Sequence, residues 1–309
     1  MKKNKKAKKR RACPFKMAIG HGQAYVPSKA RDNGQTALII IGVLFFLIML
    51  VWPLFEVIYR ALKDGWDLYF SAITAENTLS ALRVTLIAAV IALLVDTVFA
   101  LVAAWLLTKF DFKGKSFLTT LIDIPFSISP VIAGLAFIMM FGRNGLATPV
   151  INWINDTFGT DIALVFSIPG VVLATIFVTF PYVLRELLPV MNMQGNSEEE
   201  AAALLGAGGF TIFFKVTLPH IKWSLVYGMV LCAARAFGEF GAVYAVSKTR
   251  GETFTLPLEV DALYMSGGAE AITQSFAVSS ILVLLALIML ILKNIAEWRA
   301  RKSEEQEGI

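Results

Sequence analysis

Two side chains of opposite charge stand inside an otherwise apolar stretch of the sequence. Arg235 and Glu239 are four residues apart, so a continuous helix would place them on one face. A charge inside a membrane span is costly and usually marks a functional site. The planar guanidinium of Arg235 offers a fork of donors that fits an oxyanion, so the pair could line an anion path. The pair could equally neutralise itself and fix the packing of helices.

Two further carboxylates have apolar surroundings. Asp96 lies inside a long apolar run, and Asp123 lies near the end of another. Either could be a partner for Arg235, or a hydrogen-bonded group in the interior of a helix bundle. We therefore treat Asp96 and Asp123 as secondary candidates for the same path.

Two prolines interrupt the apolar run that follows Asp123. Pro125 and Pro130 remove backbone donors and kink or break a helix, which is tolerated where helices pack or line a cavity. Ser127 and Ser129 lie between these prolines. Their hydroxyl groups could contact an anion, although hydrogen bonding between helices is the commoner role.

The sequence offers no residues for covalent or metal chemistry. His21 and His220 are far apart, and Cys13 and Cys232 fall in a polar tail and an apolar run respectively. These four residues supply neither a nucleophile–base pair nor a metal-ligand cluster. We expect Cys232 to be a small packing residue.

Two glycine-containing segments look like phosphate loops but do not fit the patterns. Gly114–Ser116 ends like a P-loop, yet Lys109 stands where the first glycine is needed. Gly206–Gly208 is not a dinucleotide fingerprint, because the third glycine position holds Thr211. We therefore expect this chain to bind no cofactor and to be no enzyme.

The elements that must position these residues are membrane helices. Of 309 residues, 57% are hydrophobic and only 17% are charged, whereas a soluble chain carries about a quarter charged residues. Unpaired backbone groups are not tolerated in lipid, so each apolar run near 20 residues is expected to be a helix. The predicted fold is all-α, with six transmembrane helices at about 36–59, 79–107, 117–141, 162–184, 221–246 and 271–295.

The distribution of Lys and Arg predicts the orientation, because cytoplasmic loops carry more of them. With a cytoplasmic N-terminus, the inner side holds ten Lys and Arg residues and the outer side six, even before the basic N-terminal residues are counted. Both termini are therefore expected in the cytoplasm. Residues 1–35 are expected to be a disordered tail attracted to membrane lipid, rather than a nucleic-acid-binding segment.

The loop between the fourth and fifth runs is expected to hold two short helices at one membrane face. Ser197 and Glu200 have the spacing of a capping box, which predicts a helix start. Gly206, with the glycines that follow it, is expected to end that helix. A second amphipathic turn is expected to end at Pro219. Such an element is suited to docking rather than to spanning.

The spacing of this loop resembles the signature E-A-A-x3-G-x9-I-x-L-P of permease subunits of bacterial ABC importers. The matching positions are Glu200, Ala201, Ala202, Gly206, Val216, Leu218 and Pro219, with valine where the family usually has isoleucine. The resemblance implies a coupling helix that inserts into a cleft of a separate cytoplasmic ATPase. The alternative is an ordinary capped helix at the membrane interface.

Other segments are similar to the permeases for tetrahedral oxyanions, in particular to the W-type subunits of sulfate and thiosulfate importers. These segments are Asp123–Gly134, Thr179–Leu187, Ala234–Val243, Arg250–Leu258 and Leu292–Arg299. Together they extend the resemblance over about residues 36–300. The resemblance implies import of sulfate or thiosulfate across a bacterial inner membrane, with molybdate or another oxyanion as the alternative.

The resemblance also implies a type I (MetI-like) permease domain at 36–300, a coupling loop at about 197–219 and a cytoplasmic tail at 301–309. The implied partners are a CysA-like ATPase that carries ATP–Mg, a CysT-like second permease and an extracytoplasmic sulfate/thiosulfate-binding protein. The outer loop that starts at Arg250 could meet that binding protein, or be a solvated connector. An ATP-independent ion-coupled carrier is the competing class, but the Pro125–Pro130 break has no counterpart in the sixth run.

Overall fold

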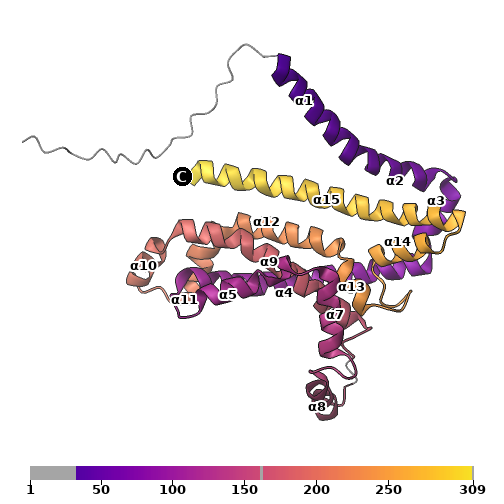
Figure 1. The fold of residues 1–309 in the computed structure, drawn as a ribbon. Coiled ribbons are helices and arrows are strands. Elements are labelled where there is room, and N and C mark those ends of the chain that lie inside the picture. The colour runs from indigo at the N-terminus through magenta and orange to yellow at the C-terminus, as the bar shows by residue number, and fades with distance from the viewer. Residues whose placement is uncertain (1–32, 161–162, 308–309) are drawn as a thin grey trace, which may run out of the picture. The chain divides into compact units, whose positions relative to one another are not determined.

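The computed structural model describes residues 33–160 and 163–307, and every regular element in these ranges is a helix (Figure 1). The prediction of an all-α chain is therefore confirmed for the described residues. Most of the predicted basic tail, residues 1–32, lies outside them. At the other end the backbone stays helical to Glu307, through most of the segment expected to be a tail.

The chain divides into two units, residues 1–51 and 52–309. The first contains helix α1, Asn33–Phe46, and the π-helical segment η1, Leu47–Val51, and none of its described side chains is buried. Long apolar side chains without burial suit a lipid environment. The second unit contains the other described helices and the buried core.

Five helical stretches are long and apolar enough to cross a membrane: Thr36–Leu62, Glu76–Lys109, Ile168–Gln194, Gly209–Phe237 and Ala269–Arg299. They correspond to five of the six predicted spans. The second is helix α4, whose 34 residues make it the long span that the sequence predicts. The third is helix α9.

The stretch predicted as the third span is interrupted. It consists of α5, Lys115–Ile122, α6, Ile124–Ser127, and α7, Pro130–Phe141. Pro125 lies in the first turn of α6, where its missing N–H cannot continue the hydrogen bonds of α5, and Pro130 disfavours helical backbone at Ser129, whose ψ is 132°. The predicted break is confirmed, and the span predicted at 117–141 consists of three short helices.

The stretch predicted as the fifth span is also interrupted. Helix α12, Leu218–Phe237, ends before the short helix α13, Gly241–Val246. Helix α13 packs against α7, and this contact requires small residues. A Cβ atom on Gly134 would lie 2.6 Å from the carbonyl oxygen of Ala242. The two interrupted segments therefore meet at a close backbone contact.

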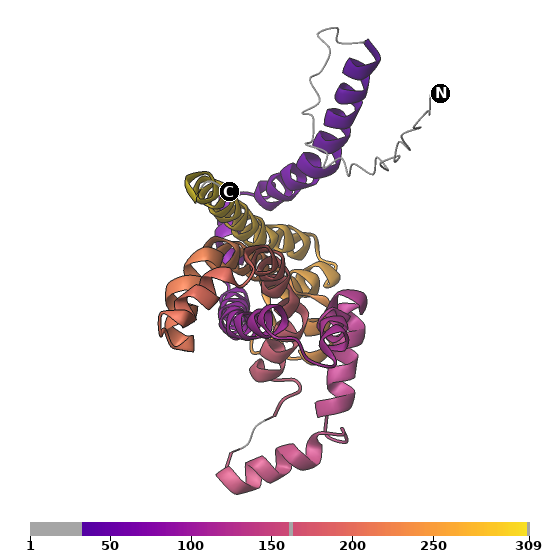
Figure 2. The same cartoon turned by 90° about the vertical axis from the view of Figure 1, so that its left-hand side faces the viewer.

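The core lies where α4, α9 and α12 pack together, and Figure 2 views these helices nearly end-on. Alanines on α4 allow the close approach: Ala100 and Ala104 are fully buried against Leu184 and Leu187 of α9. Cys232 of α12 is fully buried in the same cluster, as predicted for a packing residue. This core gives the polar side chains a rigid frame.

The remaining helices surround this core. Helix α15, Ala269–Glu307, packs against α2, Trp52–Leu62, and against α12. It also packs against α3, Trp66–Thr74, and α14, Leu256–Met265. Helix α8, Thr148–Phe158, follows α7 and has no buried residue. The sequence did not predict α3, α8 or α14, because each is short.

Candidate functional site

The loop with the signature spacing forms a turn between α9 and α12, which we call the α10 turn (residues 195–217). It contains α10, Ser197–Leu204, then α11, Gly209–Ile212, and the π-helical segment η2, Phe213–Thr217. The predicted short helix is present. The predicted capping box is wrong, because Asn196 precedes the helix and no side chain caps it.

Helix α10 ends before a glycine, whereas the far end of the turn continues into α12 without a break. Gly206, with φ +88°, adopts the left-handed conformation that lets the chain leave α10, as predicted. The predicted end at Pro219 is wrong, because α11, η2 and α12 follow without interruption. Pro219 lies in the first turn of α12, directly after the π-helical segment η2, and the backbone stays helical through it. The α10 turn therefore runs directly into a membrane span.

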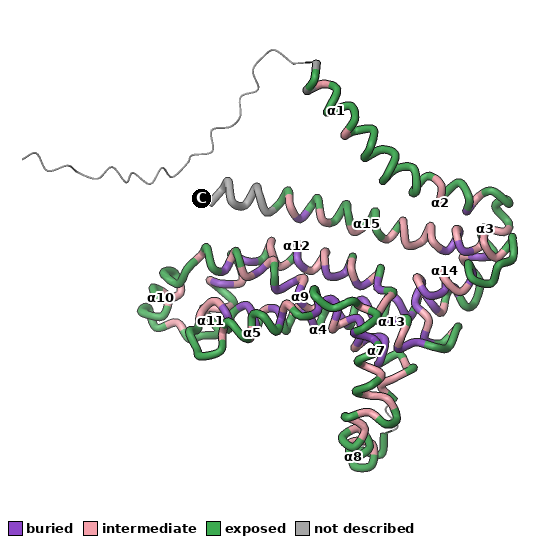
Figure 3. The backbone as a smooth tube through the Cα atoms, viewed as in Figure 1, coloured by how far each residue is buried: buried purple, intermediate pink, exposed green. Residues whose placement is uncertain are grey.

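The signature residues lie together on this segment. Glu200, Ala201, Gly206 and Pro219 are exposed, and Ala202, Val216 and Leu218 are half-buried. Large apolar side chains accompany them: Leu204 and Leu205 are each 90% exposed and Phe210 is 86% exposed. Figure 3 shows the turn as mostly exposed, in contrast to the buried α9. An exposed apolar group beside charged residues is typical of a protein-binding surface.

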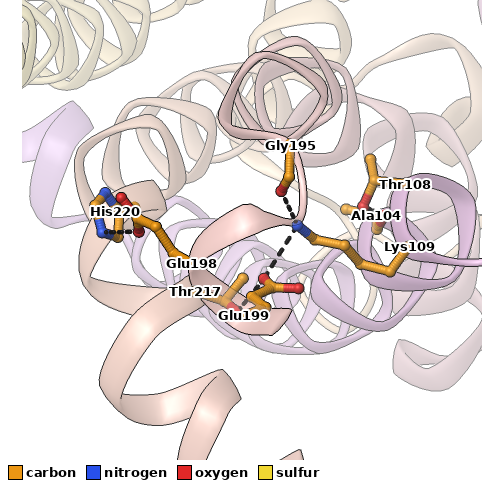
Figure 4. Close-up of polar contacts among 8 residues, drawn as sticks. All are labelled: Ala104, Thr108, Lys109, Gly195, Glu198, Glu199, Thr217 and His220. Atoms are coloured by element: carbon orange, nitrogen blue, oxygen red, sulfur yellow. Dashed lines mark hydrogen bonds and ion pairs between the residues drawn. The ribbon is translucent and has the colours of Figure 1, made fainter. Parts of the chain in front are cut away.

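A buried lysine joins α10 to the rest of the molecule (Figure 4). The Nζ of Lys109, the last residue of α4, lies 3.0 Å from a carboxylate oxygen of Glu199 and donates to the carbonyl of Gly195 at 2.7 Å. The Thr217 hydroxyl donates to the same Glu199 oxygen at 2.6 Å. Only 6% of the Lys109 side chain and 14% of the Glu199 side chain are exposed.

A second contact lies on the surface of the same turn. A carboxylate oxygen of Glu198 lies 2.9 Å from Nε2 of His220 at the start of α12. Sequence reasoning singled out Glu200 and missed its neighbours Glu198 and Glu199. The available signal was the run of three glutamates in the first turn of a helix, where the helix dipole favours negative charge.

The charged pair of the fifth span forms, but with a different geometry from the one predicted. Arg235 lies in α12, whereas Glu239 lies in the break between α12 and α13. Their closest atoms, Nη2 and Oε2, are 2.6 Å apart in an ion pair whose angle does not suit a hydrogen bond. The other Glu239 oxygen accepts from the backbone N–H of Ala242 at 2.8 Å. The buried Glu239 therefore holds two groups: the Arg235 guanidinium and the backbone at the start of α13.

The other two carboxylates do not pair with Arg235, so that alternative is wrong. Asp96 is fully buried in α4, where it accepts hydrogen bonds from Thr179 at 2.6 Å and from the Cys232 thiol at 3.5 Å. It joins α4, α9 and α12, which confirms the alternative of an interior hydrogen-bonded group. Asp123 accepts from Arg185 of α9 at 2.9 Å instead.

The serines between the two prolines are exposed. Ser127 and Ser129 have no side-chain hydrogen bond among the described residues, so the expected bonding between helices is not present. Nearby in sequence, Asp123 forms an ion pair with Arg185, and the Arg185 guanidinium stacks 4.2 Å from the centre of the Phe126 ring. The break between α6 and α7 is thus connected to α9 by charge and stacking.

The loop that starts at Arg250 is not a solvated connector. The Arg250 guanidinium makes bonds of 2.6 and 2.9 Å to both oxygens of Glu259, whose side chain is only 1% exposed. These hydrogen bonds raise the pKa of Arg250 above its ordinary value, so the group stays charged. Thr253 and Thr255 are buried. The loop is therefore part of the folded unit.

None of these charged groups forms a metal site: the described residues contain no cluster of three or more His, Cys, Asp or Glu side chains suited to one. The charged groups instead connect helices in pairs. Their arrangement suits a helix bundle that has a separate docking surface on the α10 turn.

Comparison with known proteins agrees with this arrangement. The family described as binding-protein-dependent transport system inner membrane component matches residues 96–302. The sulfate transport system permease protein CysW of Escherichia coli strain K12 is 43% identical over 274 residues, which are 88% of this chain and 91% of that protein. The CysW protein of Synechocystis is 42% identical over 264 residues, which are 85% of this chain and 92% of that protein.

A second type of permease and a solved structure are also similar. The sulfate transport system permease protein CysT of Escherichia coli strain K12 is 33% identical over 222 residues, 72% of this chain and 78% of that protein. A bacterial alginate ABC transporter, solved in complex with a periplasmic protein, has the same fold, with TM-score 0.69, 18% identity and coverage of 86% of this chain and 93% of that one. The chain therefore belongs to the family of binding-protein-dependent transport system inner membrane components.

Proposed function

We propose that this chain is the permease subunit of an ATP-driven importer that carries sulfate or thiosulfate across the inner membrane of a bacterium. The α10 turn carries the proposal: it presents the signature residues with exposed Leu204, Leu205 and Phe210 at the start of a membrane span. The names of the CysW relatives support the choice of substrate.

ATP binding and hydrolysis are assigned to a separate CysA-like ATPase subunit that carries the ATP–Mg. The exposed apolar side chains of the α10 turn fit a cleft on such a partner, and Glu200 adds a charge at its rim. Closure of two ATPases would displace α10. The displacement would reach the spans, open the path to one side and reset it after hydrolysis.

A CysT-like second permease and an extracytoplasmic binding protein complete the proposed complex. Similarity to the CysT protein supports a paired permease of related fold. The α7 surface offers apolar area for such a partner, since Met139 is 77% exposed and Ile132 is 60% exposed. The binding protein would select the anion, so this subunit needs only weak contacts with it.

The proposed anion path passes the junction of the two interrupted segments. Pro130 of α7 packs closely against Gly241 of α13, since a Cβ atom on Gly241 would lie 3.0 Å from the Cβ of Pro130. Ser129 directly precedes Pro130 in the sequence and is therefore next to this contact. Arg235 precedes that contact and keeps 27% of its side chain exposed. Arg235 and the exposed serines would supply donors to the anion, whereas Glu239, Asp123 and Asp96 would position helices.

The experiment that tests this function is uptake of labelled sulfate by cells that lack their own sulfate importer and carry this chain with its partner subunits. We expect saturable, ATP-dependent uptake that thiosulfate competes and molybdate competes little. Uptake of molybdate without sulfate would keep the ABC permease assignment and overturn the substrate. Uptake without any ATPase subunit would indicate the ion-coupled carrier.

A further inference from the structure

Hydrophobic burial does not hold α10 in place. None of its side chains is buried, and its sequence, SEEEAAAL, is largely glutamate and alanine. A helix of eight residues is not stable alone, so its position must come from its neighbours. Glu198 and Glu199 form ion pairs and a hydrogen bond with residues outside α10. Polar contacts therefore set the position of α10.

The covalent connection to α9 is a weak constraint. Gly195, between α9 and α10, has φ +68° and ψ −157°, a conformation that essentially only glycine adopts. A Cβ atom at this position would meet nothing within 4 Å, so no side-chain packing limits rotation of the backbone there. A glycine with this freedom can act as a hinge, and a force on α10 would bend it rather than move α9.

Lys109 gives a stiffer connection. Its ammonium group forms an ion pair with Glu199 on α10 and donates a hydrogen bond to the carbonyl of the hinge glycine, so it joins the ends of α4, α9 and α10 at one point (Figure 4). With 6% of its side chain exposed, the lysine is poorly screened by water, and a charge-assisted hydrogen bond is the strong kind. Thr217 connects the same Glu199 oxygen to the segment before α12.

We propose that Lys109 and Glu199 are positioning residues that form a fixed joint, through which movement of α10 reaches α4. Helix α4 packs along α9 and α12 across the core, so a displacement of its inner end is carried through the membrane. This role rests on the proposed function, because it concerns how ATP hydrolysis on a partner becomes movement of the spans.

The test uses the assembled complex in proteoliposomes and compares sulfate uptake per ATP hydrolysed. Replacing Lys109→Met removes the charge and donors but keeps the length of the side chain. We expect the ATPase to co-purify and ATP hydrolysis to continue, while uptake per ATP falls by about tenfold, within the usual range of coupling between two sites. Lys109→Arg keeps a cation with donors, so it is expected to restore most of the uptake per ATP.

The matched control is Lys115→Met, which removes a lysine from an exposed pair whose partner Asp111 is fully exposed; its uptake per ATP should equal that of the unmodified chain. Unchanged uptake per ATP in Lys109→Met would overturn the joint. Failure of Lys109→Met to assemble would overturn it as well, since Lys109 would then be a folding residue. If the unmodified complex hydrolyses ATP without sulfate uptake, the proposed substrate fails, and the ratio is measured again with the oxyanion that it does transport.

Discussion

The membrane core and the α10 turn are held together in different ways. In the core, Ala100 and Ala104 of α4 lie fully buried against Leu184 of α9. In α10 no side chain is buried, and the described contacts of Glu198 and Glu199 outside the helix are ion pairs and hydrogen bonds. Close packing resists displacement, whereas a short helix held by charges can move as a unit. The difference suits one region to form the path and the other to receive a partner.

This comparison separates two kinds of mutation. Changes in the core should lower the stability of the protein and, through it, every activity. Changes on the exposed side of the α10 turn should leave stability unaltered and weaken only the binding of the proposed partner. The predictions below begin with the largest expected loss of stability.

The largest effect is expected from Gly134→Leu. A Cβ atom there would already lie 2.6 Å from the Ala242 carbonyl oxygen and 2.7 Å from the Ala245 Cβ, so leucine must separate α7 from α13. We expect a destabilisation of about 3 kcal/mol or more, seen as a lower unfolding temperature in detergent. Gly209→Ala is the control in the α10 turn, where an added Cβ meets nothing within 4 Å. Equal unfolding temperatures for the two variants would contradict the claim that the core is closely packed and the α10 turn is not.

A large effect is also expected from Glu239→Ala. This change leaves Arg235 without its partner and frees the N–H of Ala242 at the start of α13. Removing one member of a largely buried pair costs about 3 kcal/mol, measurable by thermal unfolding. Glu239→Gln keeps an oxygen for Ala242 and should lose less. If the alanine variant is as stable as the unmodified chain, Glu239 does not hold the break together.

A smaller effect is expected from Asp96→Ala. The variant leaves the Thr179 hydroxyl and the Cys232 thiol without their acceptor at the junction of three helices. Lost hydrogen bonds to a buried group cost about 2 kcal/mol, read from the same unfolding measurement. Asp96→Asn retains an acceptor oxygen and should stay closer to the unmodified chain. A stability order with asparagine below alanine would argue against the hydrogen-bonded role.

The smallest effect on stability is expected from replacing both Leu204 and Leu205 with alanine. Each side chain is 90% exposed, so little packing is lost and the change should stay within about 0.5 kcal/mol. Under the proposed function, binding of the ATPase should weaken at the same time, because the proposed docking surface loses apolar area. A marked fall in unfolding temperature would mean that these leucines belong to the folded core.

The sequence was sufficient to predict the features that depend on local pattern. Apolar runs predicted six spans, five of which are long apolar helices. The spacing from Glu200 to Pro219 predicted the family, and Pro125 with Pro130 predicted a broken helix. The break after Phe237 was missed, since Gly238 and Gly241 also fit the small residues of a tightly packed continuous helix. A glycine in an apolar run can therefore indicate either a helix break or close packing of a continuous helix, and the local pattern does not distinguish the two.

Contacts between distant segments could not be predicted. The ion pair of Lys109 and Glu199 depends on how the end of α4 lies beside α10, and the partners of Asp96 come from two other helices. Which of several acidic neighbours bonds inward depends on helix rotation, so Glu199 could not be distinguished from Glu200 by spacing alone. Such pairings require the packed arrangement of the helices.

The most direct test of the central claim is co-purification of the ATPase subunit with a Glu200→Arg variant of this chain, beside the unmodified chain. Glu200 is exposed, so insertion and unfolding temperature should be unchanged. We predict that the ATPase is lost from the purified complex and that sulfate uptake stops. A Glu200→Arg variant that retains the ATPase and full uptake would contradict the assignment of the α10 turn as the coupling site.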